Sequence, residues 1–343
     1  MLNRIELKPA ELERILAGLK EVRVCVLGDV CLDMYWYADM KRSRLSRETP
    51  HHPLPIVKEH YFPGGCGNVL NNVHALGIKK LVPISVVGND WRGFLLNRWL
   101  QERNIDTSEI FTGDRITPCY CKPMRMGISD VVYEDPRLDF ENFEELGKEE
   151  EDRIIGALER AAGQVDIIAV SDQYRFGVVT PLVRKKLAEL GMRGVMVVVD
   201  SREKVQEYHN VIVKPNGMEA AMAVGVDITD LEMGEEDYAE VAYKLFLRNK
   251  KPVVVTLGER GSIWYDEKGS CFAPTRKAAP PVDIVGAGDT FLSAFCCAIA
   301  AGADGGQALA FGNLAAGVTV KKIDTTGTAS PTEIAEKYRE NCQ

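Results

Sequence analysis

The sequence predicts an α/β fold, in which crossover helices wrap a mainly parallel sheet and a small β appendage projects from it. Short β-branched runs alternate with helical patterns along most of the chain. Two segments with aromatic, alternating or proline-containing patterns interrupt this alternation. A chain of 343 residues with 45% hydrophobic composition can bury one large core. We therefore expect a single domain over residues 1–343.

The alternating segments are predicted in order from their periodicity. Strands are expected where β-branched residues cluster: Val22–Leu27, Leu81–Val87, Asp166–Val170, Val195–Val199, Val211–Val213 and Val253–Thr256. Helices are expected between them: Val69–Leu76, Gly93–Arg103, Glu150–Ala162, Pro181–Leu190 and Glu236–Arg248. A further segment, Phe291–Ala301, is apolar on every side and stops at Gly302, which predicts a buried helix.

The two interrupting segments, about 34–62 and 115–135, are predicted to form a small β lid inserted in the core. Met34-Tyr35-Trp36-Tyr37 and Pro55-Ile56-Val57 are typical of extended strands, and the prolines suit edge positions.

The overall charge and the cysteines restrict the partners. A net charge of −8 offers no basic field for a polyanion, so we expect no nucleic acid partner. No apolar run reaches the roughly 18 residues that span a bilayer, and the first ten residues do not resemble a signal peptide. We expect no membrane association and a cytoplasmic location. The nine cysteines are dispersed among apolar residues, which favours buried reduced thiols.

The most informative segment runs from Asp283 to Phe291 and reads Asp-Ile-Val-Gly-Ala-Gly-Asp-Thr-Phe. Gly286, Ala287 and Gly288 are small enough for their N–H groups to approach an anion at a helix start. Asp289 can be a simple cap of that helix. It can also be a base that deprotonates an alcohol while the amides hold the transferring group, which is chemistry suited to phosphoryl transfer.

The run from Gly286 to Thr290 resembles the C-terminal signature of the ribokinase-like (PfkB) sugar kinases. Other segments similar to family signatures occur in the same order: Gly28 to Asp33, Pro63 to Asn68, Lys214 to Glu219 and Thr256 to Gly261. The resemblance implies a three-layer α/β/α sandwich with a mainly parallel central sheet, ATP as phosphoryl donor and Mg²⁺. In this family the lid covers the sugar and often pairs with a second subunit, so we expect a homodimer through the lid.

The resemblance assigns the sugar to the N-terminal motifs. Asp33 would accept hydrogen bonds from sugar hydroxyls, and its alternative is a turn or cap carboxylate. Gly64 and Gly65 would let the backbone approach the sugar, while Asn68 offers a donor and an acceptor. Hinge glycines and a helix cap explain the same motif. Lys122 is a candidate for a distal phosphate, as are Arg42, Arg44, Arg47 and Arg125, although such residues also occur as solvated charges.

The resemblance assigns the nucleotide to the later motifs. Asn216 and Glu219 share a helix face and would organise Mg²⁺ through water, although the same pair is a standard capping arrangement. The other candidates are Lys214 for phosphate charge, Thr256 with the turn glycines Gly258 and Gly261, and Asn313 in the adenine pocket. A potassium ion near Asp283 and the loop Ile323 to Thr328 is also compatible with the resemblance.

Within the family, the chain resembles the kinase domain that phosphorylates D-glycero-D-manno-heptose 7-phosphate at the anomeric hydroxyl. The segments Asp33 to Tyr37, Pro55 to Lys58 and Gly327 to Pro331 carry this similarity. Two lid segments depart from it, Ser43 to His52 and Ser129 to Asp135. Other acceptors (fructose, ribose or a nucleoside) and a non-catalytic nucleotide- or sugar-binding regulator therefore remain alternatives. The dinucleotide fingerprint is incomplete because Phe291 replaces its third small residue, which disfavours an oxidoreductase.

Overall fold

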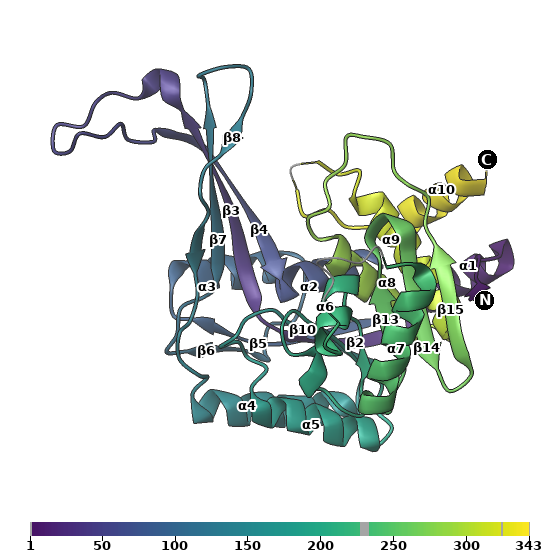
Figure 1. The fold of residues 1–343 in the computed structure, drawn as a ribbon. Helices are drawn as coiled ribbons and strands as arrows, with labels where there is room; N and C mark the ends of the chain where they lie inside the picture. Colours follow the sequence, from purple (N-terminus) through teal and green to yellow (C-terminus); the bar gives the residue numbers. More distant parts are fainter. Residues whose placement is uncertain (1, 227–232, 324, 343) are drawn as a thin grey trace.

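A computed structural model describes residues 2–226, 233–323 and 325–342, and Figure 1 shows a large central sheet between helices with a smaller sheet projecting from it. The central sheet has ten strands in the order β1-β15-β14-β13-β12-β11-β10-β2-β5-β6. Their bounds are β1 Asn3–Arg4, β2 Arg23–Gly28, β5 Lys80–Gly88, β6 Ile110–Gly113, β10 Ile167–Asp172, β11 Val197–Ser201, β12 Ile212–Val213, β13 Val253–Thr256, β14 Gly261–Asp266 and β15 Gly269–Pro274. The predicted α/β fold class is confirmed.

The parallel part of the sheet places the site. β10 pairs in parallel with β11 on one side and with β2 on the other, and β5 continues the parallel order beyond β2. The carboxyl ends of these strands therefore lie along one edge, where open α/β sheets bind ligands. The exception is the hairpin of β14 and β15, which extends the sheet from β13 in antiparallel pairing.

Helices cover both faces of the sheet and divide the core into two apolar layers. One layer contains side chains of α1 Pro9–Gly18, α2 Cys66–Ala75, α3 Trp91–Glu102, α8 Ala287–Ala300, α9 Gly305–Thr319 and α10 Pro331–Cys342. The other contains side chains of α4 Lys148–Ala162, α5 Pro181–Met192, α6 Gly217–Ala223 and α7 Glu235–Asn249. This arrangement is the expected three-layer sandwich.

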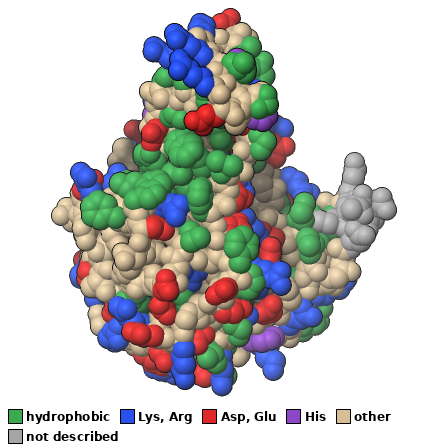
Figure 2. Space-filling model, turned by 90° about the vertical axis from the view of Figure 1, so that its left-hand side faces the viewer, with side chains coloured by type: hydrophobic (Ala, Val, Ile, Leu, Met, Phe, Trp, Pro, Cys, Tyr) green, Lys and Arg blue, Asp and Glu red, His purple; other side chains and the backbone are tan. Residues whose placement is uncertain are grey.

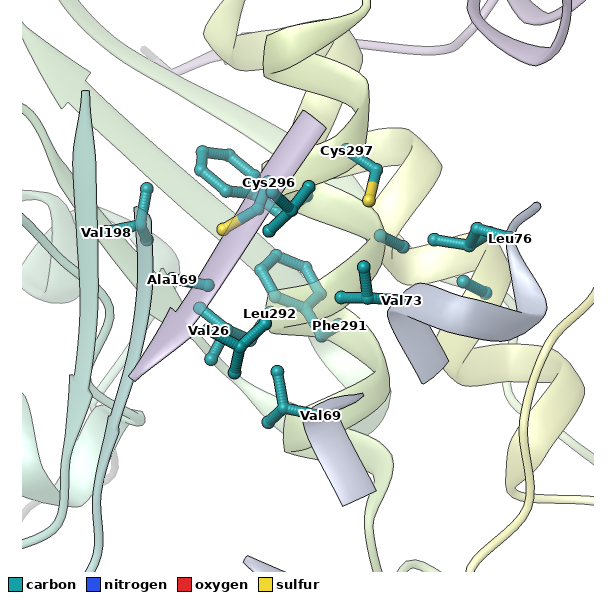
Figure 3. Close-up of a cluster of buried hydrophobic side chains, with 14 of the residues drawn as sticks. Val26, Val69, Val73, Leu76, Ala169, Val198, Phe291, Leu292, Cys296 and Cys297 are labelled. Carbon is teal, nitrogen blue, oxygen red and sulfur yellow. The ribbon is translucent and has the colours of Figure 1, made fainter. Parts of the chain in front are cut away.

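Helix α8 is buried, as its all-apolar sequence predicts. In Figure 3, Phe291 and Leu292 of α8 lie among Val26 of β2 and Val69 and Val73 of α2. Each of these five side chains is at most 3% exposed. This packing fixes the start of α8 against the start of α2, and both helix starts carry predicted site residues.

The smaller sheet, which we call the lid, has the order β4-β3-β7-β8, and β9 also pairs with β7. Its strands are β3 Val30–Asp39, β4 Ile56–Gly65, β7 Cys119–Met126, β8 Tyr133–Glu134 and β9 Leu138–Phe140. It therefore begins at Val30 rather than Met34 and extends to Phe140 rather than residue 135. The earlier start arises because β3 follows β2 almost directly, and the later end arises because β9 pairs with β7.

The predicted strands all occur, and the largest differences in bounds are of one or two residues: Val195–Val199 is found as β11 Val197–Ser201. The sequence did not predict α1, α10, β1, β6, β9 or the β14–β15 hairpin. All nine cysteines are free thiols, and seven of them are buried. Among the helices in the described part of the chain, none has the length and apolar character needed to cross a lipid bilayer.

Candidate active site

The start of α8 is an open glycine turn. Gly286 caps the helix with φ of 77°, the left-handed region that favours glycine. A Cβ there would lie 2.5 Å from Asn68 Nδ2, so only glycine lets the two helix starts meet. The Ala287 N–H donates to Ile284 O at 3.2 Å and is therefore not a free donor, in contrast to the expectation from the sequence. Within the described residues, the N–H groups of Gly288 and Asp289 have no acceptor, as is usual in a first helical turn.

Asp289 lies on this first turn and points to α2. Its Oδ2 accepts a hydrogen bond of 2.8 Å from Asn68 Nδ2. Burial raises the pKa of Asp289 to about 7, the Asn68 hydrogen bond opposes that rise, and the Asp200 carboxylate adds to it. A carboxyl group with this pKa can both take up and release a proton near neutral pH.

Asp33 lies on β3 at the base of the lid and depends on a glycine in the neighbouring strand. A Cβ at Gly64 would lie 2.6 Å from Asp33 Oδ1, so a larger residue would displace the carboxylate. Burial raises the pKa of Asp33 to about 6, and the cations Lys122 and Arg137 oppose that rise. Asp33 in turn contributes to the raised pKa of Asp289, so the fold brings these two carboxylates into one site.

Lys122 and Gly65 belong to the two strands that pair with β3, the strand of Asp33. Lys122 on β7 pairs with Tyr35 on β3, and its Nζ donates to the Tyr35 hydroxyl at 3.3 Å. Gly65 ends β4 and caps α2 with φ of 53°, and a Cβ there would lie 2.8 Å from the backbone oxygen of Asp29. The turn therefore aims Asn68, in the first turn of α2, at Asp289.

A cavity of about 400 Å³ opens on the other side of the glycine turn. Many predicted nucleotide residues line it, together with two of the glycine turn: Asn216, Thr256, Gly258, Gly261, Asn313, Ala287 and Gly288. Val282, Ile284 and Val320 supply apolar walls, which suits a purine ring. Asp289 is outside this lining, so the turn separates the cavity from the side that holds Asn68 and Asp33.

Lys214 is not exposed to this cavity. It is 3% exposed and its Nζ forms an ion pair of 2.8 Å with Asp200 Oδ2. Burial acts to lower the pKa of Lys214, but Asp200, together with Glu219 and Asp289, outweighs it and the pKa is raised. The charge of Lys214 is therefore largely balanced by Asp200 before any phosphate arrives.

Asn216 and Glu219 form the capping arrangement of α6. Asn216 Oδ1 accepts from the Glu219 N–H at 2.9 Å, and Glu219 Oε2 accepts from the Asn216 N–H at 2.8 Å. Burial raises the pKa of Glu219, and Asp200 adds to that rise. Of the two alternatives for this pair, capping is observed, and among the described residues it leaves Glu219 Oε1 without a hydrogen-bond donor.

The donors near α6 suit magnesium only in a hydrated form. No group of three or more His, Cys, Asp or Glu side chains in the described ranges could hold a metal ion. Glu219 and Asp200 are nevertheless close enough for Asp200 to raise the pKa of Glu219. Two carboxylates without a full cage fit a magnesium ion that keeps most of its water and is bound by nucleotide phosphates.

Four further residues belong to this region and were not predicted. Asp200 follows three valines near the carboxyl end of β11, a position that could have indicated it. Arg137 stacks over the Tyr120 ring at 4.0 Å and acts on Asp33. Asn72 lies one helical turn after Asn68, and Thr290 follows Asp289.

Asn313, which was predicted, donates to Ala273 O at 2.9 Å and accepts from the Ser262 hydroxyl, so its amide also ties α9 to the hairpin.

Comparison with known proteins gives a consistent result. The sequence profile described as pfkB family carbohydrate kinase matches residues 23–333. The bifunctional protein HldE of a Nitratiruptor species is 34% identical over 319 residues, covering 92% of this chain and 65% of that protein. The bifunctional protein HldE of Geotalea uraniireducens is 31% identical over 328 residues, covering 94% of this chain and 64% of that protein. This chain thus spans less than two thirds of the length of these curated relatives.

Solved structures show the same fold at low sequence identity. Phosphofructokinase-2 from Escherichia coli, in complex with substrates and products, superposes with a TM-score of 0.73 at 19% identity, covering 94% of this chain and 100% of that one. Ribokinase from Arabidopsis thaliana, complexed with ribose and ATP, gives a TM-score of 0.67 at 18% identity, covering 93% of this chain and 99% of that one.

Proposed function

This chain belongs to the pfkB family of carbohydrate kinases, and from that premise we propose that it transfers the γ-phosphoryl group of ATP to a hydroxyl group of a sugar or sugar phosphate. One observation carries the proposal. The glycine turn at Gly286 to Gly288 lies between a cavity lined by the predicted nucleotide residues and a site that holds Asp289, Asn68 and Asp33. A phosphoryl donor and an alcohol acceptor need such a boundary, where they meet in line.

In the proposed mechanism, Asp289 takes the proton of the attacking hydroxyl. The free N–H groups of Gly288 and Asp289 would stabilise negative charge on the transferring group, with the positive end of the α8 dipole behind them. Asp33 accepts hydrogen bonds from sugar hydroxyls and thereby orients the acceptor. Holding the hydroxyl in line can supply roughly 7 to 11 kcal/mol of the barrier reduction, so positioning is the major contribution.

ATP would occupy the 400 Å³ cavity with its base against the apolar wall near Val282 and Ile284. Magnesium, when bound, supplies charge that neutralises the phosphate oxygens. Glu219 and Asp200 would hold its water shell. Lys214 would keep Asp200 ionised and in place through their ion pair. A potassium ion near Asp283 stays a prediction, and Asp324 of the loop assigned to it lies outside the described residues.

For the acceptor, we propose heptose 7-phosphate. The lid-strand resemblance and the similarity to HldE proteins support it. Lys122 lies beside Asp33 and Tyr35, which supports it as the cation that binds the distal phosphate. Arg125 instead pairs with Asp135, and Arg42 pairs with Asp39, so both are already neutralised.

The test is an ADP-release assay with ATP and Mg²⁺ on heptose 7-phosphate, fructose, ribose and a nucleoside. We expect heptose 7-phosphate to give the highest kcat/KM, and a preference for an unphosphorylated sugar would reject that acceptor. On the best substrate, Asp289→Asn should lower kcat by about 10² to 10⁴.

Asp304→Asn is the matched control for this substitution. Asp304 caps α9 through the Gln307 N–H, which an asparagine also does, so its turnover should match wild type. Turnover of Asp289→Asn near wild type would show that Asp289 is not the base. If the protein binds ATP but turns over none of the sugars, the alternative of a non-catalytic nucleotide- or sugar-binding regulator would be favoured.

A further inference from the structure

Asn68 is held from behind by a second buried amide. Asn72, one turn further along α2 and 2% exposed, donates through Nδ2 to Asn68 O at 3.0 Å and to Asn68 Oδ1 at 3.1 Å. Asn72 Oδ1 accepts from the Thr290 hydroxyl at 3.0 Å, and the same hydroxyl also lies 3.1 Å from its other acceptor, Gly286 O. Thr290 follows Asp289 in α8, so the contacts form a closed loop between the two helices: Asp289, Asn68, Asn72 and Thr290.

The backbone decides which way both amides face. Asn72 Nδ2 also points to Gly327 O at 3.4 Å, and carbonyl oxygens such as Gly327 O and Asn68 O can only accept. The NH₂ of Asn72 must therefore face these carbonyls, and its oxygen must face the Thr290 hydroxyl. It follows that Asn68 presents its oxygen to Asn72 and its NH₂ to Asp289. The opposite orientation of Asn68 would place two oxygens against each other.

We propose that Asn72 and Thr290 are positioning residues that lock the Asn68 amide with its NH₂ toward Asp289. The lock keeps the carboxylate oriented and favours its ionised form. This inference rests on the proposed role of Asp289 as base for its effect on turnover, but not for its effect on the carboxylate itself.

Other charges act on Asp289 and have to be kept constant in the test. Lys214 after β12 lowers its pKa, whereas Asp200 on β11 and Asp33 on β3 raise it. The nearby thiols of Cys31 and Cys66 have pKa values well above their usual range because they are buried, so they stay neutral. All of these groups belong to other residues, so substitutions at Asn72 and Thr290 leave the charges around Asp289 unchanged.

The experiment measures the Asp289 titration directly, by NMR of protein labelled with ¹³C at aspartate carboxyl groups, with Asp289→Asn to assign the signal. Asn72→Leu removes the donor that fixes Asn68 at nearly constant volume. We expect the Asp289 midpoint to rise by about one pH unit, and by less in Thr290→Val, which removes only the outer hydroxyl. The acid limb of kcat/KM should move by the same amount.

Two variants separate the lock from ordinary helix packing. Thr290→Ser keeps the hydroxyl and should restore the wild-type midpoint. Ser293→Ala removes a different buried hydroxyl of α8, which donates to Val69 O of α2 and to Asp289 O, and should leave the midpoint unchanged. An unchanged midpoint in Asn72→Leu would overturn the inference, and so would an equal shift in Ser293→Ala. A shifted midpoint together with an active Asp289→Asn would support the lock and reject Asp289 as the base.

Discussion

At the scale of single residues, the site contains two carboxyl groups whose pKa values are raised mainly by burial. The pKa of Asp289 rises to about 7 and that of Asp33 to about 6. The cations Lys122 and Arg137 oppose the rise in the pKa of Asp33. The rise in the pKa of Asp289 is opposed mainly by the Asn68 amide. This difference separates the two groups, so that Asp33 ionises first and Asp289 titrates near neutral pH.

The separation predicts the pH dependence of the reaction. The base must be ionised, so kcat/KM should fall about tenfold per pH unit as the pH drops below about 7. Below about 6 the fall should steepen, because protonated Asp33 turns one acceptor oxygen into a donor and accepts more weakly from sugar hydroxyls. The measurement is kcat/KM of the acceptor across this range at saturating ATP. A profile that stays flat down to about pH 5 would contradict the assignment of Asp289.

Gly64 gives a prediction about the acceptor alone. Gly64→Ala places a methyl group against the Asp33 carboxylate, which must move, so we expect the KM of the acceptor to rise between about tenfold and a hundredfold. The KM of ATP should stay unchanged because Gly64 is outside the lining of the nucleotide cavity. Gly163→Ala, at a site with no atom within 4 Å of the added Cβ, is the control. A parallel rise in both KM values would indicate a global defect.

At the scale of elements, helix starts carry most of the site. α2, α6 and α8 begin at Asn68, Asn216 and Asp289 or within three residues of them, and their first-turn N–H groups need partners. At α6 the Asn216 side chain caps the helix by accepting from the Glu219 N–H, whereas at α8 no side chain caps the first turn. The polar side chains at the start of α6 therefore bond to their own backbone, whereas the start of α8 has free N–H groups that can bind an anion.

Helix α3 offers a prediction on stability, because Asp90 ties its start to the segment that leads into β7 of the lid. Asp90 accepts from the N–H groups of Arg92, Gly93 and Thr117 at 2.9 to 3.0 Å. Asp90→Ala should lower the free energy of unfolding in urea at pH 7 by about 2 kcal/mol, while Asp90→Ser, which can still cap, should lose less. Equal losses in the two variants would show that the cap contributes little.

The pH dependence of this contribution has a definite sign. Burial acts to raise the pKa of Asp90, but the Gly93 and Thr117 hydrogen bonds outweigh it and the pKa is lowered. The stabilisation is therefore fully present above the pKa of the unfolded chain and is lost as the pH falls through the lowered value. The difference between wild type and Asp90→Ala should shrink accordingly in acid.

At the scale of the whole molecule, the lid carries several exposed apolar side chains. Figure 2 shows hydrophobic side chains gathered on the lid and where it meets the core. Among the exposed apolar residues on and beside its strands are Leu54, Ile56, Val57, Val131, Val132 and Leu138. β4 is an edge strand of this sheet, so its outer backbone groups can pair with another chain.

We therefore predict that the protein is a dimer through the lid. Val57→Asp, on the exposed part of β4, should shift the mass in sedimentation equilibrium from dimer to monomer, since a charge is costly in an apolar interface. Leu182→Asp, at a similarly exposed apolar position on α5, should leave the mass unchanged. A wild-type protein that is monomeric at high concentration would contradict the prediction.

The sequence alone determined the alternation of strands and helices, the buried helix α8 and the order of the motifs, because these depend on local periodicity and on short runs of residues. It did not determine the β14–β15 hairpin or the full extent of the lid, since pairing partners distant in the chain decide both. Nor could it choose between cap and ligand for Asn216 and Glu219.

Asp33 and Asn68 lie in the N-terminal part of the chain and Asp289 in the C-terminal part. Only the tertiary structure brings them into one site. Packing of α2 against α8 made the contact between Asn68 and Asp289, and it also placed Asn72 behind Asn68. The physical reason is that hydrogen-bond partners and desolvation depend on which surfaces meet. Those surfaces, and the pKa values that follow from them, are properties of the folded core rather than of any local run of residues.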